Sequence, residues 1–362
     1  GLPDTLPGHG IDNALLGYTL ALQLEMHGTR VTLVSKDINL RIKAAILGVH
    51  AEDYFNDRTI EDADLLFTGV SGLPADFWET HGNNMESWQE QARTFYRVRG
   101  PLVREWQPNQ FLFDSGGDSF EAIVRTVEDD VAKLELTQDY RGERHAIWGI
   151  TARNREQNLA LNLLLDPEID FVTILGPAGT GKTLLALAAG LMQTLETNRF
   201  SEIIMTRVTI PLGEDIGFLP GTEEEKMEPW MGALMDNLEV LTQSQDGGSW
   251  GRAATQDLLR HRIKIRSLNF MRGRTFLNRY LILDEAQNLT SKQMKALVTR
   301  AGPGTKLVCL GNIGQIDTPY LTETTSGLTY VVNRFRGWLH AGHVTLARGE
   351  RSRLADFASE VL

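Results

Sequence analysis

Short apolar runs that alternate with helical patterns dominate the second half of this 362-residue chain. The runs lie at FVTILG (171–176), EIIMTR (202–207), IKIRSL (263–268), YLILDE (280–285), TKLVCLGN (305–312) and HVTLAR (343–348). Continuous apolar runs of this length, separated by helical segments, are typical of strands that are buried on both faces. The pattern predicts an α/β fold with a doubly wound parallel sheet over residues 147–362.

The first part of the chain shows a shorter version of the same alternation. IDNALLGYTLALQLEMHG (11–28) has apolar residues at roughly helical spacing, VTLV (31–34) is a strand, and NLRIKAAILG (39–48) is a helix closed by Gly48. The order helix, strand, helix implies parallel packing but only part of a domain. We therefore expect residues 1–75 to be the C-terminal part of a small α/β domain. Because the chain opens on loop-like residues, we also expect it to lack an upstream segment.

Residues 76–146 are predicted to be a connector with a small β subdomain. Short apolar alternations fill residues 100–138, and DSGGDS (114–119) and EDD (128–130) have the composition of turns. In contrast, NNMESWQEQARTFYRV (83–98) is compatible with a helix.

Composition narrows the class of protein. With 42% hydrophobic and 23% charged residues the chain is globular, and its net charge of −11 argues against a globally basic nucleic-acid binder. A local basic groove is still compatible with that charge. The single cysteine, Cys309, cannot form an internal disulfide, which favours a reducing compartment. We find no apolar run long enough to span a membrane and no signal peptide, so we expect a cytoplasmic protein without a membrane partner.

The most specific motif is GPAGTGKT (176–183), which follows one predicted strand and precedes an alanine- and leucine-rich helix. This is a complete phosphate-loop pattern: its glycines let backbone amides face the phosphates, and the helix start adds its positive dipole end. Lys182 is expected to reach the β and γ phosphates, and the Thr183 hydroxyl to ligate Mg²⁺. The predicted nucleotide-binding residues here are Gly176, Pro177, Ala178, Gly179, Thr180, Gly181, Lys182, Thr183 and Leu184.

Two later strands end in polar residues that fit the same chemistry. In RYLILDEAQNLT (279–290), Asp284 would hold the magnesium ion through water, and Glu285 would orient and deprotonate the attacking water. Two acids after an apolar run often only start a helix, but downstream of a phosphate loop the catalytic interpretation is stronger. Asn312 and Gln315 follow the next strand and could sense the γ phosphate, although Asn and Gly also form ordinary turns. Together these motifs predict an NTPase.

Arginines cluster near the end of the chain, at Arg348, Arg351 and Arg353. An arginine after a late strand can stabilise charge on the transferring phosphoryl group, in cis or from a neighbouring subunit. The alternative is a solvated cluster that pairs with Glu350 and Asp356. Arg348 and Arg351 are the catalytic candidates.

Several longer segments resemble the PhoH-like ATPases, relatives of the ATPase core of superfamily 1 helicases. They are GPAGTGKTLLALAAGL, PLGEDIGFLPGTEEEKMEPWM, RGRTFLNRYLILDEAQNLT, GNIGQIDTPYLTETTSGLTYVVNRFRG and LARGERSRLA, within residues 147–362. The resemblance implies ATP with Mg²⁺ as cofactor, RNA as partner and a homo-oligomer, expected to be a hexameric ring. It also implies that Gln157, with Asn154, reads the adenine edge; without it, both residues would simply be polar groups at a helix start.

The front of the chain resembles a PIN domain, a nuclease fold that gathers carboxylates to hold Mg²⁺ or Mn²⁺. Asp12, at a helix start, and Asp37, at a strand end, match two of that family's acidic positions. Asp53 and Asp57 are further candidates, with a solvated surface as the favoured alternative. Capping of the next helix is the simpler role for Asp37. The family's first acidic strand has no counterpart before Asp12, so we expect this metal site to be incomplete. Either the chain is a fragment, which we favour, or its PIN domain is vestigial.

Two functions from different classes fit the sequence. The first is an ATP hydrolase that translocates on or unwinds single-stranded RNA, coupled to PIN ribonuclease activity when that domain is complete. The alternative is a regulatory or assembly ATPase whose PIN module binds RNA or a protein without cleaving. Individually weak candidates for RNA contact are Arg272, Arg274, Lys292, Lys295 and Arg300 for phosphates, and Phe218, Trp230 and Phe270 for stacking.

Overall fold

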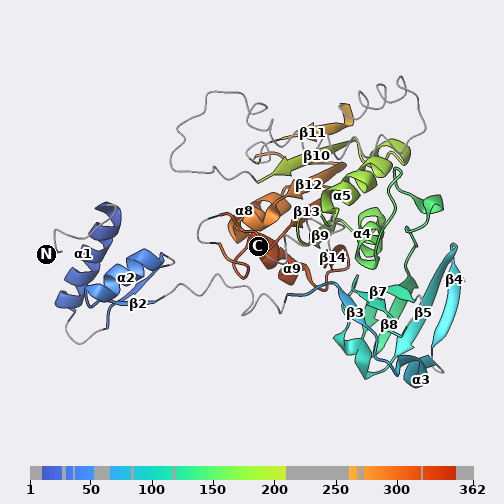
Figure 1. The fold of residues 1–362 in the computed structure, drawn as a ribbon, viewed down its shortest axis with the longest axis horizontal. Helices are drawn as coiled ribbons and strands as arrows, with labels where there is room; N and C mark the ends of the chain where they lie inside the picture. The colour runs from blue at the N-terminus through green and yellow to red at the C-terminus, as the bar shows by residue number, and fades with distance from the viewer. Residues whose placement is uncertain are drawn as a thin grey trace, which may run out of the picture. The chain divides into compact units, whose positions relative to one another are not determined.

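The computed structural model describes residues 10–26, 30–35, 37–52, 66–82, 85–116, 120–208, 261–266, 268, 273–318 and 321–347 (Figure 1). The chain divides into two compact units, residues 1–59 and residues 60–362, and each has a core of its own. Among the described residues, no helix is long and apolar enough to cross a membrane.

The first unit contains α1 (Gly10–Glu25), β1 (Thr32–Val34), α2 (Ile38–Ile46) and β2 (His50–Glu52). β1 and β2 pair in parallel, with Thr32 opposite His50. The small core of this unit consists of Leu16, Leu33, Leu40, Ala44 and Val49. Gly48, with a φ of +74°, follows α2, as is common where a chain leaves a helix. The predicted order of helix, strand and helix, and its parallel packing, are confirmed.

The second unit begins with an antiparallel sheet in the order β3-β6-β7-β8-β5-β4, in which only β3 and β6 run parallel. Its strands are β3 (Val70–Gly72), β4 (Glu86–Glu90), β5 (Arg93–Arg99), β6 (Phe111–Phe113), β7 (Glu121–Glu128) and β8 (Val131–Leu136). Short helices flank them at α3 (Phe77–His81), η4 (Pro101–Glu105) and η5 (Glu143–His145). One face of the sheet packs on buried Phe77, Val103 and Trp106. The meander predicted over residues 100–138 is thus confirmed as β6, β7 and β8.

The helix considered for residues 83–98 is wrong, because this stretch contains the hairpin β4–β5. Trp88 faces Phe95 across the two strands, and Glu90 faces Arg93. The two connecting residues, Gln91 and Ala92, have φ values of +49° and +62°. Two left-handed residues in a row form the tight turn that matches the twist of a hairpin, and that turn usually contains Asn or Gly. Without those residues the turn gave no signal in the sequence.

A six-stranded parallel sheet follows, in the order β11-β10-β12-β13-β9-β14. Its strands are β9 (Phe171–Leu175), β10 (Glu202–Arg207), β11 (Ile263–Ile265), β12 (Arg279–Asp284), β13 (Lys306–Gly311) and β14 (Ala341–Thr345). All neighbouring pairs run parallel. Each of the six predicted strands is therefore present, and the α/β fold class is confirmed.

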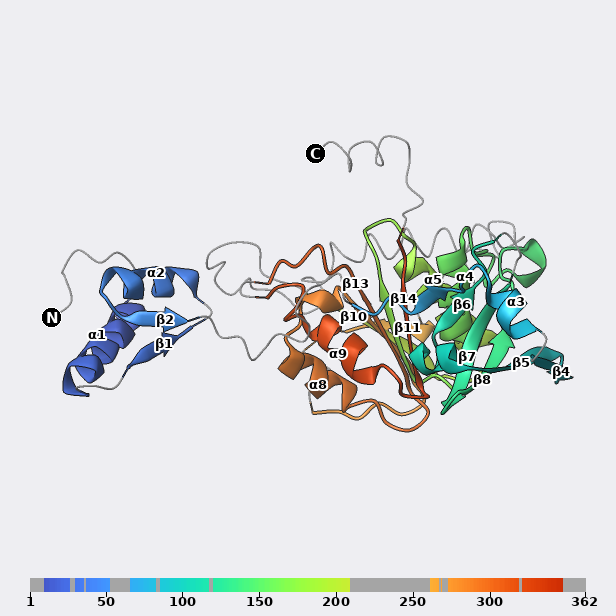
Figure 2. The same ribbon diagram turned by 90° about the horizontal axis from the view of Figure 1, so that it is seen from below.

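Helices cover both faces of this sheet (Figure 1 and Figure 2). One layer contains α4 (Arg155–Leu165), α5 (Lys182–Leu191) and its π-helical extension η6 (Met192–Glu196); the other contains η8 (Ala286–Asn288), α8 (Ser291–Val298) and α9 (Gly327–Phe335). Alternate residues of β12 serve the two layers: Tyr280 and Ile282 join the core on the α4–α5 side, and Leu281 and Leu283 the core on the α8–α9 side. Burial on both faces explains why these strands are continuously apolar.

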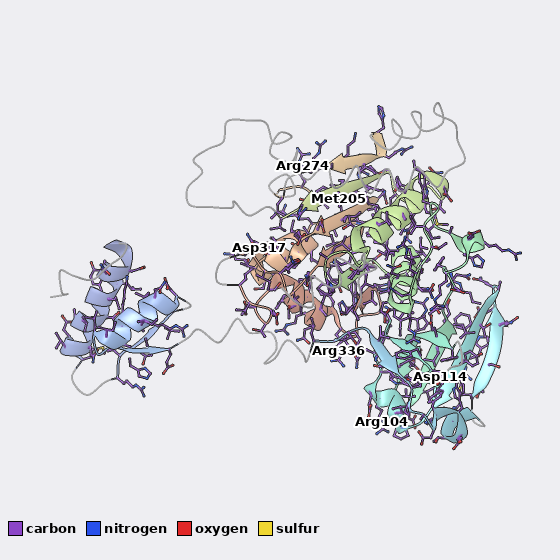
Figure 3. All side chains as sticks on the ribbon, in the orientation of Figure 1. Arg104, Asp114, Met205, Arg274, Asp317 and Arg336 are labelled. Carbon is purple, nitrogen blue, oxygen red and sulfur yellow. The ribbon has the colours of Figure 1, made fainter. Side chains whose placement is uncertain are left out.

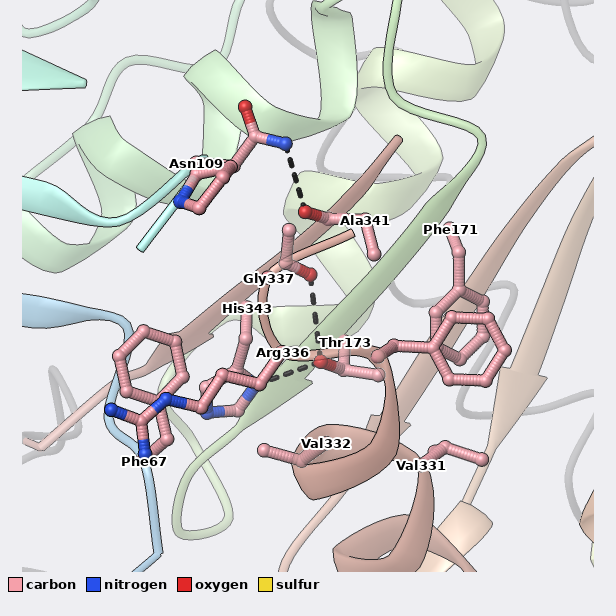
Figure 4. A pocket seen from close by; sticks show the side chains of 13 residues that line it. Phe67, Asn109, Phe171, Thr173, Val331, Val332, Arg336, Gly337, Ala341 and His343 are labelled. Carbon is pink, nitrogen blue, oxygen red and sulfur yellow. Dashed lines mark hydrogen bonds between the residues drawn. The ribbon is translucent and has the colours of Figure 1, made fainter. Parts of the chain in front are cut away.

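The outer edge of β14 joins the parallel sheet to the antiparallel one (Figure 4). The amide of Thr345 donates to the Thr68 carbonyl at 3.0 Å, and Asn109 Nδ2 donates to the Ala341 carbonyl at 2.9 Å. A Cβ on Gly69 would lie 1.8 Å from the His343 carbonyl oxygen, so only glycine fits there. The cavity at this junction is about 20 Å³, which is room for roughly one water molecule and too little for a ligand.

The burial of His343 at this junction leads us to expect that the free energy of unfolding decreases in acid. Its ring lies with Nδ1 2.7 Å from Thr173 Oγ1 and Nε2 3.1 Å from Thr345 Oγ1, and burial lowers its pKa to about 3. The unfolded chain titrates near the ordinary value of about 6.5. Between these values only the unfolded state binds the proton, so stability falls as the pH drops below about 6.5, by at most about 1.4 kcal/mol per pH unit.

Denaturant unfolding of the wild type and of His343→Gln between pH 7.5 and 5.5 measures this contribution. We expect the wild type to lose stability more steeply with acidification than the variant, because the glutamine amide has no site that binds a proton in this range. Parallel pH profiles for the two proteins would contradict the assignment, whatever their difference in absolute stability.

Candidate active site at the carboxyl edge of the parallel sheet

The phosphate loop connects β9 to α5 in a left-handed curl. Gly176, Gly179 and Gly181 have φ values of +154°, +80° and +85°, conformations that glycine adopts without steric cost. A Cβ on Gly176 would lie 2.6 Å from the Leu346 carbonyl oxygen. Pro177, Ala178 and Gly179 are exposed, whereas Thr180 is buried and its hydroxyl donates to the Pro177 carbonyl at 3.0 Å. Residues 177–179 of the loop are therefore open to solvent, and the buried Thr180 holds the loop in place through its hydrogen bond.

Lys182 begins α5 and folds back over this loop. Its Nζ donates to the carbonyls of Gly176 at 2.6 Å and Pro177 at 2.8 Å, and lies 3.4 Å from Thr180 Oγ1. Carbonyl dipoles hold the ammonium group where a phosphate would need it, and a phosphate oxygen would offer a stronger, charged acceptor. Thr183, next in the helix, is half-buried, as is Leu184.

Gln157 of α4 braces the phosphate loop from behind. Its side chain is buried; Nε2 donates to the Thr180 carbonyl at 3.0 Å, and Oε1 accepts from the Arg153 amide at 2.9 Å. Asn154 is the N-cap of α4, and its Oδ1 accepts from the Gln157 amide at 2.9 Å. Both ends of the Gln157 amide are thus engaged by the chain itself. Asn154 has the helix-start role that its sequence position alone suggests, and the adenine contact of Gln157 stays a prediction.

Asp284 and Glu285 lie where β12 ends, with β13 between that strand and β9. Asp284 is buried, and its pKa is raised, first by burial and then by the negative charge of Glu285. The positive charges of Arg207 and Lys182 act in the opposite direction and lower that pKa. Lys182 follows β9 and Asp284 ends β12, two parallel strands separated only by β13, so the lysine of the phosphate loop and the acid of β12 stand at the same edge of the sheet. A divalent cation there would favour the charged carboxylate.

Glu285 is held by two side chains that the sequence did not single out. Its backbone is left-handed, with φ +54° and ψ +37°, an uncommon conformation for a residue with a Cβ. Its Oε1 lies 3.0 Å from a terminal nitrogen of Arg207, the last residue of β10. Its Oε2 accepts from Gln287 Nε2 at 2.6 Å. Both carboxylate oxygens therefore have a fixed donor.

Gln287 also connects Glu285 to the segment after β13. It is fully buried; Nε2 donates to the Gln315 carbonyl at 2.9 Å, and Oε1 accepts from the Asn312 amide at 3.1 Å. The side chains of Asn312 and Gln315 hydrogen bond to each other at 2.9 Å. The structure thus brings the predicted Glu285, Asn312 and Gln315 together, through a glutamine whose only sequence signal was its place in DEAQN.

Leu346, just after β14, lies beside the start of the phosphate loop. Its amide donates to the Leu175 carbonyl at 2.8 Å, and the Gly176 amide donates to the Gly311 carbonyl at 3.1 Å. The ends of β14, β9 and β13 are therefore tied together at one point of the sheet edge. The arginine candidates Arg348, Arg351 and Arg353 lie outside the described residues.

The two acids assigned to the PIN site lie in the first unit. Asp37 is the N-cap of α2: its Oδ1 accepts from the amides of Asn39 at 2.8 Å and Leu40 at 3.3 Å, so the simpler capping role is present. Asp12 lies in the first turn of α1 and is half-buried. Within the part of the chain that the structure describes, no cluster of three or more His, Cys, Asp or Glu residues could hold a metal. Asp53 and Asp57 fall outside that part.

The candidates for RNA contact have mixed positions. Lys292 and Lys295 are exposed on α8, Arg274 is exposed before β12 (Figure 3), and Arg300 is half-buried. The remaining candidates, Arg272, Phe218, Trp230 and Phe270, lie outside the described residues.

Comparison with known proteins gives matches to both parts of the chain. The family model for PhoH-like proteins matches residues 149–358, and the model for PIN domains matches residues 2–55. Protein PhoH2 of Bacillus subtilis is 39% identical over 97% of this chain and 77% of its own length. Protein PhoH2 of Thermobispora bispora is 32% identical over 100% of this chain and 76% of its own length. The crystal structure of Pif1 helicase from Candida albicans aligns over 58% of this chain and 44% of its own, with a TM-score of 0.30 and 16% identity, too distant to support an argument.

Proposed function

Because the chain belongs to the PhoH-like protein family and carries a PIN-domain segment, we propose that it hydrolyses ATP to translocate on or unwind single-stranded RNA. The P-loop NTPase fold is the firm basis of this proposal. The observation that supports it most is that the phosphate loop with Lys182 and the acids Asp284 and Glu285 follow strands of one parallel sheet and lie at the same edge of it.

In the proposed reaction, the phosphates of ATP replace the carbonyls that Lys182 now contacts. Thr183, through its hydroxyl, and the buried Asp284 would hold Mg²⁺, which would supply neutralisation of the negative charge on the nucleotide. Such a site needs only one or two protein ligands, because phosphates and water complete the shell. Glu285 accepts the proton of the attacking water, and Asn312 and Gln315 report on the γ phosphate. Arg348 or Arg351 stabilises the charge on the transferring group.

The remaining parts of the proposal come from the family resemblance. We propose residues 1–75 as the PIN portion, 76–146 as the connector and 147–362 as the ATPase, assembled as a homohexameric ring. Asp12 and Asp37 would contribute to a Mg²⁺ or Mn²⁺ site that cleaves RNA only with further carboxylates. Capping of α2 is compatible with this role of Asp37, because an aspartate that caps a helix can still offer its second oxygen to a cation.

ATP hydrolysis measured with and without single-stranded RNA tests the motor. We expect the purified chain to hydrolyse ATP, and RNA to raise kcat several-fold, because a motor couples its chemistry to its track. The apparent affinity for RNA should fall steeply between 50 and 200 mM salt, as phosphate contacts release counterions. Duplex RNA with a single-stranded tail serves as the unwinding substrate.

The same reactions separate the two functions. ATP hydrolysis that is indifferent to RNA, with no unwinding, would exclude the motor and favour the regulatory or assembly ATPase. Mg²⁺-dependent cleavage of the RNA would support a ligand role for Asp37 if both Asp37→Asn and Asp37→Ser abolish it. The serine variant is informative because serine can still cap α2.

A further inference from the structure

The carboxylate of Glu285 is placed by a residue of the neighbouring strand. β10 and β12 pair in register, with Arg207 directly opposite Asp284, so the side chain of Arg207 arrives beside the residue that follows. Its guanidinium lies 3.0 Å from Glu285 Oε1, and the other carboxylate oxygen is occupied by Gln287. Arg207 comes from the neighbouring strand β10, whereas Gln287 lies in η8, two residues after Glu285, and is itself bonded to the segment after β13.

This arrangement has a strained backbone at its centre. A left-handed residue with a side chain persists only where its surroundings determine it, because the conformation costs roughly 1–3 kcal/mol. At Glu285 those surroundings are the guanidinium, the Gln287 amide and the start of η8. Removing one donor leaves the carboxylate free to rotate about its own side-chain bonds.

The same two strands carry a second, matching ion pair at their other end. Arg279 of β12 lies with Nε 2.8 Å from Oε1 of Glu202 of β10. Exposure is also alike: the side chains of Arg207 and Glu285 are 34% and 31% exposed, and those of Arg279 and Glu202 are 32% and 27% exposed. Both pairs tie β10 to β12, but only one of them includes a residue of the site. The Arg279–Glu202 pair is therefore a control: its loss shows what a purely structural ion pair between these strands contributes.

We propose that Arg207 is a positioning residue for ATP hydrolysis, which fixes the Glu285 carboxylate in the orientation it needs to take the proton of the attacking water. This inference rests on the proposed function, because it requires Glu285 to be the base. In this proposal Arg207 acts through Glu285, whose carboxylate it contacts. The guanidinium suits the task because its planar donors set a direction as well as a charge.

The test compares steady-state ATP hydrolysis by the wild type, Arg207→Gln, Arg207→Lys and Arg279→Gln. A base displaced by about 1 Å costs up to 100-fold in rate. We expect Arg207→Gln to lower kcat by roughly 10- to 100-fold with KM for ATP changed less than about two-fold. Arg207→Lys should recover part of the rate, since the charge remains but the fork is lost. Arg279→Gln should keep the wild-type kcat.

A double-substitution cycle shows whether Arg207 works through the carboxylate. The Glu285→Gln variant has no base to orient, so adding Arg207→Gln to it should change the residual rate less than about two-fold. Equal losses in Arg207→Gln and Arg279→Gln, or multiplicative losses in the double variant, would overturn the proposal. A rise in kcat in Arg207→Gln would overturn it as well, since that would make the ion pair a restraint.

Failure of this inference is distinguishable from failure of the proposed function. A wild type that does not hydrolyse ATP refutes the function itself. A wild type that hydrolyses ATP while Arg207→Gln does so equally fast refutes only the positioning role. Thermal unfolding of each variant accompanies the kinetics, because loss of a cross-strand ion pair should lower stability similarly in Arg207→Gln and Arg279→Gln.

Discussion

Lys182→Ala is expected to abolish measurable ATP hydrolysis and to weaken ATP binding strongly. The ammonium group is held over the phosphate loop by the carbonyls of Gly176 and Pro177 and by Thr180 Oγ1. Alanine removes the positive charge that we propose to contact the β and γ phosphates. Charge stabilisation of the transferring phosphoryl group accounts for most of its catalysis, so a loss of at least about 10³-fold in kcat/KM is expected.

Steady-state hydrolysis and titration with a fluorescent ATP analogue measure the two effects separately. The matched control is Lys133→Ala, which removes a lysine from the antiparallel sheet, where its ammonium lies 4.2 Å from the Phe95 ring centroid. The control should bind and hydrolyse ATP normally. Hydrolysis by Lys182→Ala within ten-fold of the wild type would show that the phosphates bind elsewhere.

Glu285→Gln has the second-largest expected effect, and it should separate binding from chemistry. Glutamine keeps the size of the side chain, and its one amide oxygen can still accept a hydrogen bond from Arg207 or from Gln287, but it cannot take a proton from water. A general base typically contributes about 10²- to 10⁴-fold, so kcat should fall by that amount while affinity for ATP is kept. Such a variant should hold unhydrolysed ATP.

Single-turnover hydrolysis with a quench distinguishes retained ATP from slow release of product. We expect ATP rather than ADP on the Glu285→Gln variant after many wild-type turnovers. Bound ADP, or a single-turnover rate close to that of the wild type, would remove Glu285 from the role of base. In that case the ion pair with Arg207 would be a structural tie like the one between Arg279 and Glu202.

The parts of the fold and site that follow from local pattern were predictable. Buried parallel strands are apolar throughout, and the phosphate loop needs glycines at fixed spacing, so both leave a clear sequence signal. The turn at Gln91 and Ala92 left none, because its left-handed residues lack the usual Asn or Gly. The stretch 83–98 is therefore compatible with a helix by its pattern, although it contains a hairpin.

The missed residues of the site share a different cause. Arg207 reaches Glu285 only because β10 and β12 pair in one particular register, which the sequence of neither strand specifies. Gln287 bonds to backbone groups of Asn312 and Gln315, far along the chain, so its role depends on tertiary structure. At Asp37 the local rule held: an aspartate before a helix caps it.

The junction at the outer edge of β14 bears on how the ATPase can be isolated. An unpaired strand edge is a template for strands of other molecules and hence for aggregation. Here Thr68 pairs with Thr345, Gly69 lies against the His343 carbonyl, and Asn109 bonds to the Ala341 carbonyl, so residues upstream of the phosphate loop close that edge. A protein cut at residue 147 would retain every nucleotide-binding motif and lose this cover. We therefore expect the shortest fragment that keeps the nucleotide-binding motifs and resists aggregation to begin before Phe67.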